Sequence, residues 1–471
     1  MTTNVNPARI LGRITVQGTL RLTAPLLIGE GASGEERSSR DIHVLRGKDG
    51  VPFIPGTSLA GALRSFVEAD EPRAAQLLFG TAHDAKGTDE RQSAVLLYDV
   101  ELKDAVLGVR DGVHIDNVTG TAVDGHKYDY EIVESGARGT FYAEIVLRAV
   151  HEQDEETLTR ALSHLRDLLR SGFHVGALTT KGFGRMHLRS MVVDCYDFRR
   201  PEDVAAWLAP ERGTAALHMA YTDEDRPLAA PASGDLVITA DFALAGSLIV
   251  RDSENAEAQT DEGTAPAAVM KTNAAGDYII PGTSIKGVLR HRAAYILHAI
   301  DAQEERAGQM LGALMGLSPA RMRACAQSEK NRSRFIVEEA VVTADPYKQT
   351  RIRCDRFTGG TISSALFSTC PVRQEKGVRA VTLTFGIRSM GARKVEDWEA
   401  GLCILLLKEL WLGRVAVGGE KSIGRGRLSG LHAVIHDRGR RYEMTQGQPF
   451  DEDMRQRLQT YVAALSEEVV R

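Results

Sequence analysis

Ile54-Pro55-Gly56-Thr57-Ser58-Leu59-Ala60-Gly61-Ala62-Leu63-Arg64 decides the fold of this chain, because a close copy of it follows 226 positions later. The copy reads Ile280-Pro281-Gly282-Thr283-Ser284-Ile285-Lys286-Gly287-Val288-Leu289-Arg290. In each copy the proline fixes φ, the glycine permits a sharp turn, and a hydroxyl side chain can accept a hydrogen bond from a helix N-terminus. Both stretches therefore predict the end of a strand, a tight turn and a helix capped by threonine or serine.

Other landmarks recur around the two copies in the same order. Alternating polar and apolar residues predict strands at 11–31 and 236–250, and amphipathic patterns predict helices at 155–170 and 396–410. Each helix leads into a glycine-rich loop, and the offset between the halves grows only from 226 to 240. A repeated order of this kind indicates a tandem repeat. The loops are paired as Gly176 with Gly418, Lys181 with Lys421, Gly184 with Gly424, and Arg185 with Arg425.

The element order in each half predicts an α+β fold made of two tandem ferredoxin-like modules with insertions, similar to the RNA-recognition-motif (RRM) sheet. We expect the first module over residues 1–198 and the second over 235–471. The stretch between them, 199–234, is rich in proline, alanine and acidic residues. This composition predicts a linker.

Composition excludes several classes of protein. The 471 residues carry a net charge of −5, which excludes a uniformly basic nucleic-acid coat but allows local basic patches. The five cysteines lack CxxC spacing, so they indicate neither a zinc site nor a disulfide framework. Apolar stretches of the length that a signal peptide or a membrane span needs are not found. We therefore expect a cytoplasmic protein without a membrane partner.

Basic residues gather in and near the repeats. The range 286–292 holds Lys and Arg with no acid, and 348–356 holds four basic residues against one aspartate. The glycine-rich loop at 418–422 looks like a phosphate-binding P-loop, but Glu420 and Val415 break that pattern, and the loop follows a helix instead of opening one. What remains is a backbone without Cβ atoms and with flanking cations, which suits close approach to phosphates.

Taken together, these residues resemble the RAMP superfamily, specifically the repeated backbone subunits of type III CRISPR effector complexes. The resemblance lies in the Ile-Pro-Gly-Thr-Ser turns, the Asp-x-x-Thr-Gly segments at 116–120 and 355–359, and the glycine-rich loops. Two such modules in one chain look most like the fused double subunits of the III-D group. The resemblance implies guide CRISPR RNA, target RNA, other RAMP subunits and a large polymerase/cyclase-like subunit as partners.

The resemblance also implies which residues contact RNA. The cations that match the family positions are Arg64, Lys181, Arg185, Lys286, Arg290, Arg351, Arg353, Lys421 and Arg425. Thumb hairpins, which interrupt the guide–target duplex in such subunits, are expected to emerge after Thr119-Gly120 and Thr358-Gly359, as their bases.

In this family a loop aspartate about fourteen residues before the turn proline is needed to cut target RNA, and that position falls on Asp41. A carboxylate suits this work because it can hold Mg²⁺ or orient the attacking ribose 2′-hydroxyl. In the second half the same count reaches Pro266-Ala267, so Asp261 and Asp252 are weaker candidates. We expect the second module to be silent.

Three alternatives stay open. The chain could be a structural RNA-binding backbone that does not cleave. It could be a metal-independent endoribonuclease that processes the guide precursor, with His43, His114 or His174 as acid or base. An RRM-like regulator unrelated to CRISPR would need base-stacking aromatics, and aromatic residues are only 6% of this chain.

Overall fold

The computed structural model describes residues 6–30, 42–81, 91–116, 122–209, 215, 217–222, 234–252, 268–317, 332–391 and 393–470. They form two compact units. Unit 1 comprises residues 1–110, 129–179 and 183–230, and unit 2 comprises 111–128, 180–182 and 231–471.

Unit 1 combines strands with helices along the chain. Its elements are β1 (Ile10–Leu22), β2 (Phe53–Ile54), α1 (Gly56–Asp70), α2 (Pro72–Phe79), β3 (Val95–Leu97), β4 (Val100–Glu101), β7 (Arg138–Arg148), α3 (Glu155–Ser171), β8 (Phe173–His174), β9 (Arg185–Asp197), α4 (Pro201–Leu208) and β10 (Leu217–Tyr221). The hairpin of β5 (Leu107–Ile115) and β6 (Ala122–Val133) starts and ends in unit 1, while its residues 111–128 cluster with unit 2.

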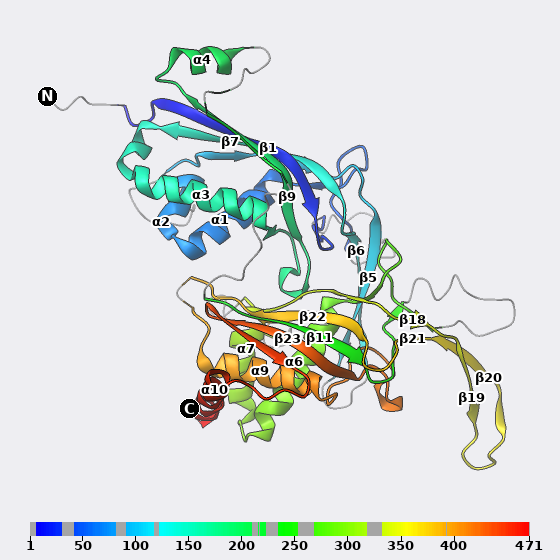
Figure 1. Cartoon of the computed structure of the whole chain (residues 1–471). Coiled ribbons are helices and arrows are strands. Elements are labelled where there is room, and N and C mark those ends of the chain that lie inside the picture. Colours follow the sequence, from blue (N-terminus) through cyan, green and yellow to red (C-terminus); the bar gives the residue numbers. More distant parts are fainter. Residues whose placement is uncertain are drawn as a thin grey trace. The chain divides into compact units, whose positions relative to one another are not determined.

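The main sheet of unit 1 has the order β10-β9-β1-β7-β3, with β8 paired to β9. The first strand, β1, lies between β7 and β9 and runs antiparallel to both. Helices α1 and α3 cover one face of this sheet (Figure 1). The predicted apolar face of α3 packs inward, with Leu158, Leu165 and Leu169 buried. Burial of this face against the sheet stabilises the helix.

Unit 2 repeats the pattern with additional short strands. Its elements are β11 (Leu236–Leu244), β12 (Ser247–Leu248), β13 (Arg251–Asp252), β14 (Ala268–Met270), β15 (Tyr278–Ile280), α6 (Gly282–Ala299), α7 (Glu304–Met315), β16 (Phe335–Val337), β17 (Ala340–Val342), β18 (Asp345–Pro346), β19 (Gln349–Cys354), β20 (Thr361–Cys370), β21 (Val372–Arg373), β22 (Arg379–Ile387), α9 (Asp397–Trp411), β23 (Leu428–Asp437), β24 (Arg440–Thr445) and α10 (Glu452–Val470).

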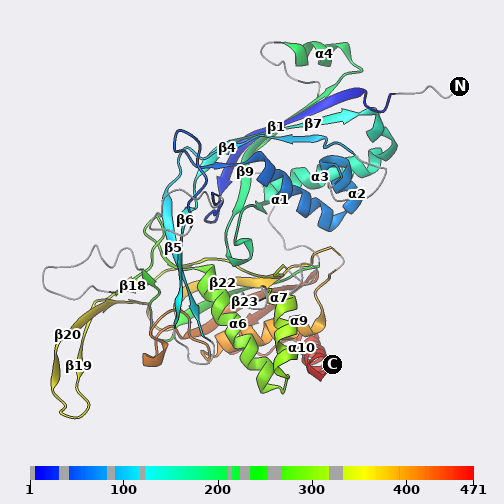
Figure 2. The same ribbon diagram turned by 180° about the vertical axis from the view of Figure 1, so that it is seen from behind.

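The main sheet of unit 2 has the order β15-β17-β22-β11-β23-β24, with β16 also paired to β22. Its first strand, β11, lies between β22 and β23 and is antiparallel to both, as β1 is in unit 1. Helices α6 and α9 lie on one face of this sheet, and α10 packs beside α9 (Figure 2). The predicted α+β class is therefore confirmed. Among the described residues, no helix is both long and apolar enough to cross a membrane.

The repeated turns end in helices as predicted, but the caps differ from the expectation. Pro55 occupies the N-cap position of α1, and the side chain of that position makes no capping hydrogen bond. Instead, Asp99 Oδ1 accepts a hydrogen bond from the Gly56 N–H group at 2.8 Å. The cap is a carboxylate more than forty residues away because proline at the N-cap moves the threonine and serine into the first turn.

The interval 199–234, predicted to be a linker, contains helix α4 and strand β10. β10 pairs with β9 along Leu217 to Tyr221 and extends the sheet of unit 1. Backbone pairing at a sheet edge depends on the neighbouring strand more than on local composition, so the Pro/Ala-rich sequence did not reveal it. The predicted borders at 198 and 235 differ from those of the compact units, which separate near residue 230.

Candidate nucleic-acid interface

Each half of the chain contains a glycine-rich loop of the same backbone shape between a helix and the last long strand. Each loop includes one turn of 3-10 helix, at residues 179–181 in the first loop and 421–423 in the second. Gly184 and Gly426 both adopt positive φ, and a Cβ atom at either would lie 1.9 Å from the carbonyl oxygen of Val175 or Val417. Only glycine fits at these two positions.

This geometry corrects the pairing of the two loops. Gly184 corresponds to Gly426, so the true offset is 242 and not 240. Arg185 therefore matches Arg427, and Lys181 matches Ile423. The sequence does contain the signal, because Gly-x-Gly-Arg occurs at 182–185 and at 424–427. Aligning the two loops by their lysines and arginines hides this repeated pattern, whereas aligning them by their glycines reveals it.

The corrected register exposes a chemical difference between the loops. Leu178 and Glu420 are equivalent, since both have left-handed backbone at φ 58° and 54°. Phe183 and Arg425 are equivalent and are both buried. Leu178 and Phe183 belong to a small apolar cluster with Leu27, Tyr130 and Ile132. The second loop places charged side chains where the first has this apolar packing.

In unit 2, Glu420 is surrounded by three arginines. Arg351 Nη2 donates to Glu420 Oε2 at 2.5 Å, and Arg251 Nη2 donates to Oε1 at 3.2 Å. Arg425 Nη1 lies 3.3 Å from Oε2. Arg351 and Arg425 were predicted to bind RNA, but Arg251 was not singled out. The sequence feature that could have identified Arg251 is its place in the repeat. It is an arginine at the end of the first strand, where the first half has Gly29.

Hairpins are present near both expected thumb positions. Among the predicted thumb residues, Thr119 and Gly120 lie outside the described residues. Thr358 and Gly359 lie in the turn between β19 and β20, so they mark the tip of that hairpin and not its base. The turn is closed by Asp355 Oδ1, which accepts hydrogen bonds from the N–H groups of Phe357 and Thr358. At 355–359 the Asp-x-x-Thr-Gly pattern is thus a turn motif, and Phe357 within it is 91% exposed.

Two of the predicted RNA-binding cations in helix α6 are used inside unit 2. Lys286 is 7% exposed, and its Nζ donates to Phe335 O at 2.7 Å, Ser333 Oγ at 2.8 Å and Thr180 Oγ1 at 2.9 Å. Arg290 Nη1 donates to the carbonyl of Gly316 at 2.8 Å, just beyond the last turn of α7. An ammonium group already bound to four acceptors and buried has little capacity left for phosphate. Helix position alone could not distinguish these inward side chains from exposed ones.

Lys286 should make the stability of the protein depend on pH. Burial, with the charges of Lys181 and Arg290, lowers the pKa of Lys286 to about 7 from its ordinary value of 10.5. The unfolded chain therefore binds more protons between these two values, so stability rises with pH across that window. We expect the free energy of unfolding to be about 2 kcal/mol higher at pH 9 than at pH 7 from this group alone. Urea unfolding followed by tryptophan fluorescence measures the difference.

The matched variants for this test are Lys286→Met and Lys408→Met, because Lys408 is exposed on α9. Lys286→Met should remove most of the rise between pH 7 and pH 9, whereas Lys408→Met should keep it. An unchanged pH dependence in Lys286→Met would show that Lys286 titrates normally in the folded protein.

The remaining predicted cations differ in exposure. Arg353 and Lys421 are exposed, in β19 and the second glycine-rich loop. Lys181 and Arg185 are half-buried, and desolvation together with Arg290 lowers the pKa of Lys181. Arg64 is 23% exposed and its Nε lies 3.9 Å from Glu68 Oε2 on the same helix. Their contacts with RNA remain a prediction.

The carboxylates proposed for catalysis do not occupy equivalent positions in the two halves of the chain. Asp41 and Asp261 lie outside the described residues. Asp252 is described: it is buried in β13, and its Oδ1 lies 3.5 Å from the Nζ of Lys271. Strand pairing makes Asp252 equivalent to Glu30 and makes Ala268 equivalent to Ile42. The residue that matches Asp41 in the second half is therefore Ala267, which carries no carboxylate.

The residues that follow Asp41 in the chain are described, and they contact one buried carboxylate. That carboxylate, of Glu131, accepts hydrogen bonds from Arg46 at 2.7 Å and from the Val44 N–H group at 3.1 Å. Among the described residues, no group of three or more His, Cys, Asp or Glu side chains could hold a metal ion. Mg²⁺ often binds through one or two carboxylates together with water and substrate phosphates. A loop carboxylate such as that of Asp41 is the kind of ligand that this binding mode uses.

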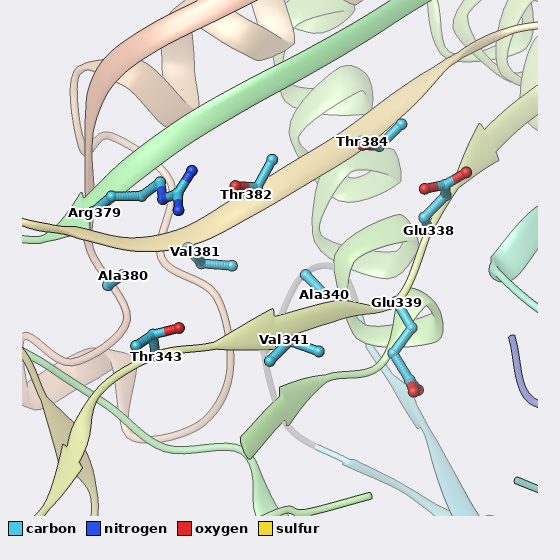
Figure 3. Close-up of a pocket in the computed structure, with 10 residues that line it drawn as sticks. All are labelled: Glu338, Glu339, Ala340, Val341, Thr343, Arg379, Ala380, Val381, Thr382 and Thr384. Atoms are coloured by element: carbon cyan, nitrogen blue, oxygen red, sulfur yellow. The ribbon is translucent and has the colours of Figure 1, made fainter. Parts of the chain in front are cut away.

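A shallow pocket of about 250 Å³ lies on the sheet of unit 2, between β17 and β22 (Figure 3). It is lined by Glu338, Glu339, Thr382, Thr384 and Arg379 among others. Its two carboxylates disfavour a phosphate. The residues predicted to bind RNA do not line it, so the candidate interface lies at the loops and hairpin instead.

Comparison with known proteins agrees with the repeated architecture. The RAMP superfamily model matches the chain twice, over residues 19–187 and 270–429, which together are more than half of its length. A curated relative from Methanocaldococcus jannaschii, named CRISPR system Cms endoribonuclease Csm3, is 23% identical over 207 residues. These residues are 39% of this chain and 82% of the relative.

Proposed function

Because the chain belongs to the RAMP superfamily, we propose that it is a two-module backbone subunit of a type III CRISPR ribonucleoprotein, which binds guide RNA and cuts the paired target RNA. The observation that carries the proposal is that the chain contains two RAMP modules' worth of matching sequence and sheet order. The family model matches twice, and the order β9-β1-β7-β3 in unit 1 corresponds to β23-β11-β22-β17 in unit 2. Both orders are those of a ferredoxin-like sheet, which supports two such modules.

The exposed cations of the loops and the hairpin are suited to contact the RNA backbone. Contacts of lysine and arginine with phosphates carry no sequence code, so target choice would come from pairing with the guide. Guide RNA, target RNA, further RAMP subunits and a large polymerase/cyclase-like subunit are the proposed partners, and the cytoplasm is the proposed location. The lengths support a fused, III-D-like arrangement. The match to Csm3 uses 39% of this chain but 82% of Csm3, so this chain has room for a second module of that kind.

Cleavage is assigned to Asp41 in the first module. Its carboxylate would hold Mg²⁺, which when bound supplies positive charge to stabilise the phosphorane-like transition state. The carboxylate would also orient a ribose 2′-hydroxyl in line with the adjacent phosphorus. Attack by that oxygen forms the O2′–P bond of a cyclic phosphate and breaks the P–O5′ bond. The 2′-proton passes to water, and water supplies the proton with which O5′ leaves as a hydroxyl. Ala267 at the equivalent position supports a second module that binds without cutting.

The guide-loaded complex should cut complementary RNA only with divalent metal. We expect labelled target RNA to be cleaved with Mg²⁺ and to survive when a chelator is added, while RNA unrelated to the guide survives in both conditions. Products should end in a cyclic phosphate and a 5′-hydroxyl. Cleavage of target RNA that persists with the chelator would contradict the metal dependence. Metal-free cutting of a guide precursor would favour the processing endoribonuclease, and binding without any cleavage would favour the structural backbone.

A further inference from the structure

The three arginines around Glu420 differ in solvent exposure, from buried to mostly exposed. We call Arg251, Arg351, Arg425 and Glu420 the Glu420 cluster. The side chain of Arg425 is 3% exposed, that of Arg351 is 23% exposed, and that of Arg251 is 63% exposed. Glu420 itself is 12% exposed. The cluster therefore joins the glycine-rich loop, the strand β13 and the hairpin strand β19 in unit 2.

The cluster holds more positive than negative charge. Its three guanidinium groups face one carboxylate, which leaves two positive charges uncompensated within the group. Burial acts to raise the pKa of Glu420, but hydrogen bonds from Arg351 and Arg251 and the charge of Arg425 outweigh it and lower that pKa. Glu420 is therefore ionised at neutral pH and holds the arginines in place. The exposed Lys421 follows it directly in the loop.

Two donor atoms in the cluster lack a hydrogen bond, although one of them, Arg425 Nη1, forms the ion pair with Glu420. Arg425 Nη1 and Arg351 Nε are buried atoms that make no hydrogen bond among the described residues. Other donors of Arg425 are used by Gln349 Oε1 and Thr369 Oγ1. Donors without a hydrogen bond beside excess positive charge favour an anionic acceptor.

The first half of the chain has no charge at any of the four equivalent positions. Leu178 takes the place of Glu420, Phe183 that of Arg425 and Gly29 that of Arg251. Ile42 pairs with Tyr130 in the first half, and its equivalent Ala268 pairs with Thr369 in the second. Tyr130 and Thr369 are therefore equivalent, and the same offset of 239 residues makes Gly112 the equivalent of Arg351. The apolar residues of the first half give the same loop conformation as the charged residues of the second. The charges of the Glu420 cluster are therefore not needed to shape the loop.

We infer that the Glu420 cluster is a phosphate-binding site that holds one phosphodiester group of RNA in the second module only, with Glu420 as its positioning residue. Planar guanidinium groups bind phosphate through paired hydrogen bonds, and two of them at different depths fix both position and orientation. This inference rests on the proposed function, since it names an RNA contact. It also gives the two modules different chemistry: a candidate carboxylate in the first and an added phosphate grip in the second.

The test measures binding of the full-length chain to a fluorescent single-stranded RNA of mixed sequence over a range of salt concentrations. Arg251→Ala and Arg351→Ala should each weaken binding about tenfold at low salt. Each should also reduce the slope of log affinity against log salt by about 0.7, the loss of one phosphate contact. Arg455→Ala is the matched control, because Arg455 is an exposed arginine of α10 paired with Glu452. It should change neither quantity, and thermal unfolding confirms that each variant is folded.

Glu420→Gln separates positioning from simple charge. This variant makes the chain more positive, so long-range attraction alone predicts tighter RNA binding. If Glu420 orders the arginines, binding weakens about threefold instead, while Leu178→Gln at the equivalent place in the first loop has no effect. Tighter binding in Glu420→Gln would overturn the positioning role.

The outcomes distinguish the inference from the proposed function. If wild type binds RNA and the arginine variants bind like Arg455→Ala, the site is wrong while the function stands. If wild type does not bind RNA, the proposed function fails first. Inorganic phosphate in competition provides a further arm: strong competition without any effect of the arginine variants on RNA would assign the cluster to a small anion and overturn an RNA contact.

Discussion

Replacing Asp41 by alanine is expected to abolish one cut in the guide-paired target RNA and to leave guide binding intact. The rate of that cut should fall by at least about 10²-fold, the scale of the loss when a reacting group is no longer held in position. The physical reason is that an alanine methyl group can neither hold Mg²⁺ nor orient the 2′-hydroxyl, and the buried carboxylate of Glu131 is already bound by Arg46 and by the backbone at Val44. The measurement is mapping of cut positions on end-labelled target RNA with Mg²⁺.

Asp261→Ala and Asp252→Asn are the companion variants. Asp261→Ala should keep every cut, because Ala267 and not Asp261 stands at the position that matches Asp41. Asp252→Asn tests whether the aspartate buried beside Lys271 supports structure alone. Survival of all cuts in Asp41→Ala would show that the first module is only a scaffold. Loss of guide binding in that variant would instead indicate a folding defect.

Glu399→Gln should lower the free energy of unfolding of unit 2 by about 3–5 kcal/mol. Glu399 forms an ion pair with Arg334, and the two side chains are only 1% and 2% exposed. The amide keeps the shape and can still accept a hydrogen bond from the Glu396 N–H group. It removes, however, the only carboxylate in the described part of the chain that contacts the buried guanidinium. A buried charge without its partner is costly because the protein interior solvates it poorly. Urea unfolding followed by tryptophan fluorescence measures the loss.

Two further variants give this measurement its meaning. Glu452→Gln removes one partner of the exposed pair with Arg455 and should change stability by less than about 1 kcal/mol. The double variant Arg334→Met with Glu399→Gln should recover much of the loss, since no uncompensated charge remains. A Glu399→Gln protein as stable as wild type would contradict a desolvated pair.

The sequence predicted the repeat and most of its elements. Each Ile-Pro-Gly-Thr-Ser stretch does end a short strand and begin a helix, because proline and glycine constrain the backbone locally. Leu158, Leu165 and Leu169 of α3 are buried as their helical spacing predicts. These features depend on neighbours in the chain, so local patterns are sufficient to find them.

The candidate site was only partly predictable. Lysines and arginines on a helix look alike in sequence, yet Lys286 is buried and bound by Thr180, which is more than a hundred positions away. Arg251 meets Glu420 across a similar separation. Pairing the loops by their cations shifted the register by two residues and concealed the match of Glu420 with Leu178. Such contacts depend on distant strands meeting in the fold.

By itself, then, the sequence determined that this protein consists of two related α+β halves of the RAMP type, since duplicated turns and helix periodicity are local and additive. Only the tertiary structure decided which cations are buried and which are exposed, that Thr358 and Gly359 form the tip of a hairpin, and that Glu420 gathers three arginines. The reason is that burial and ion pairing are properties of side chains brought together from distant positions, and their desolvation is set by the whole fold.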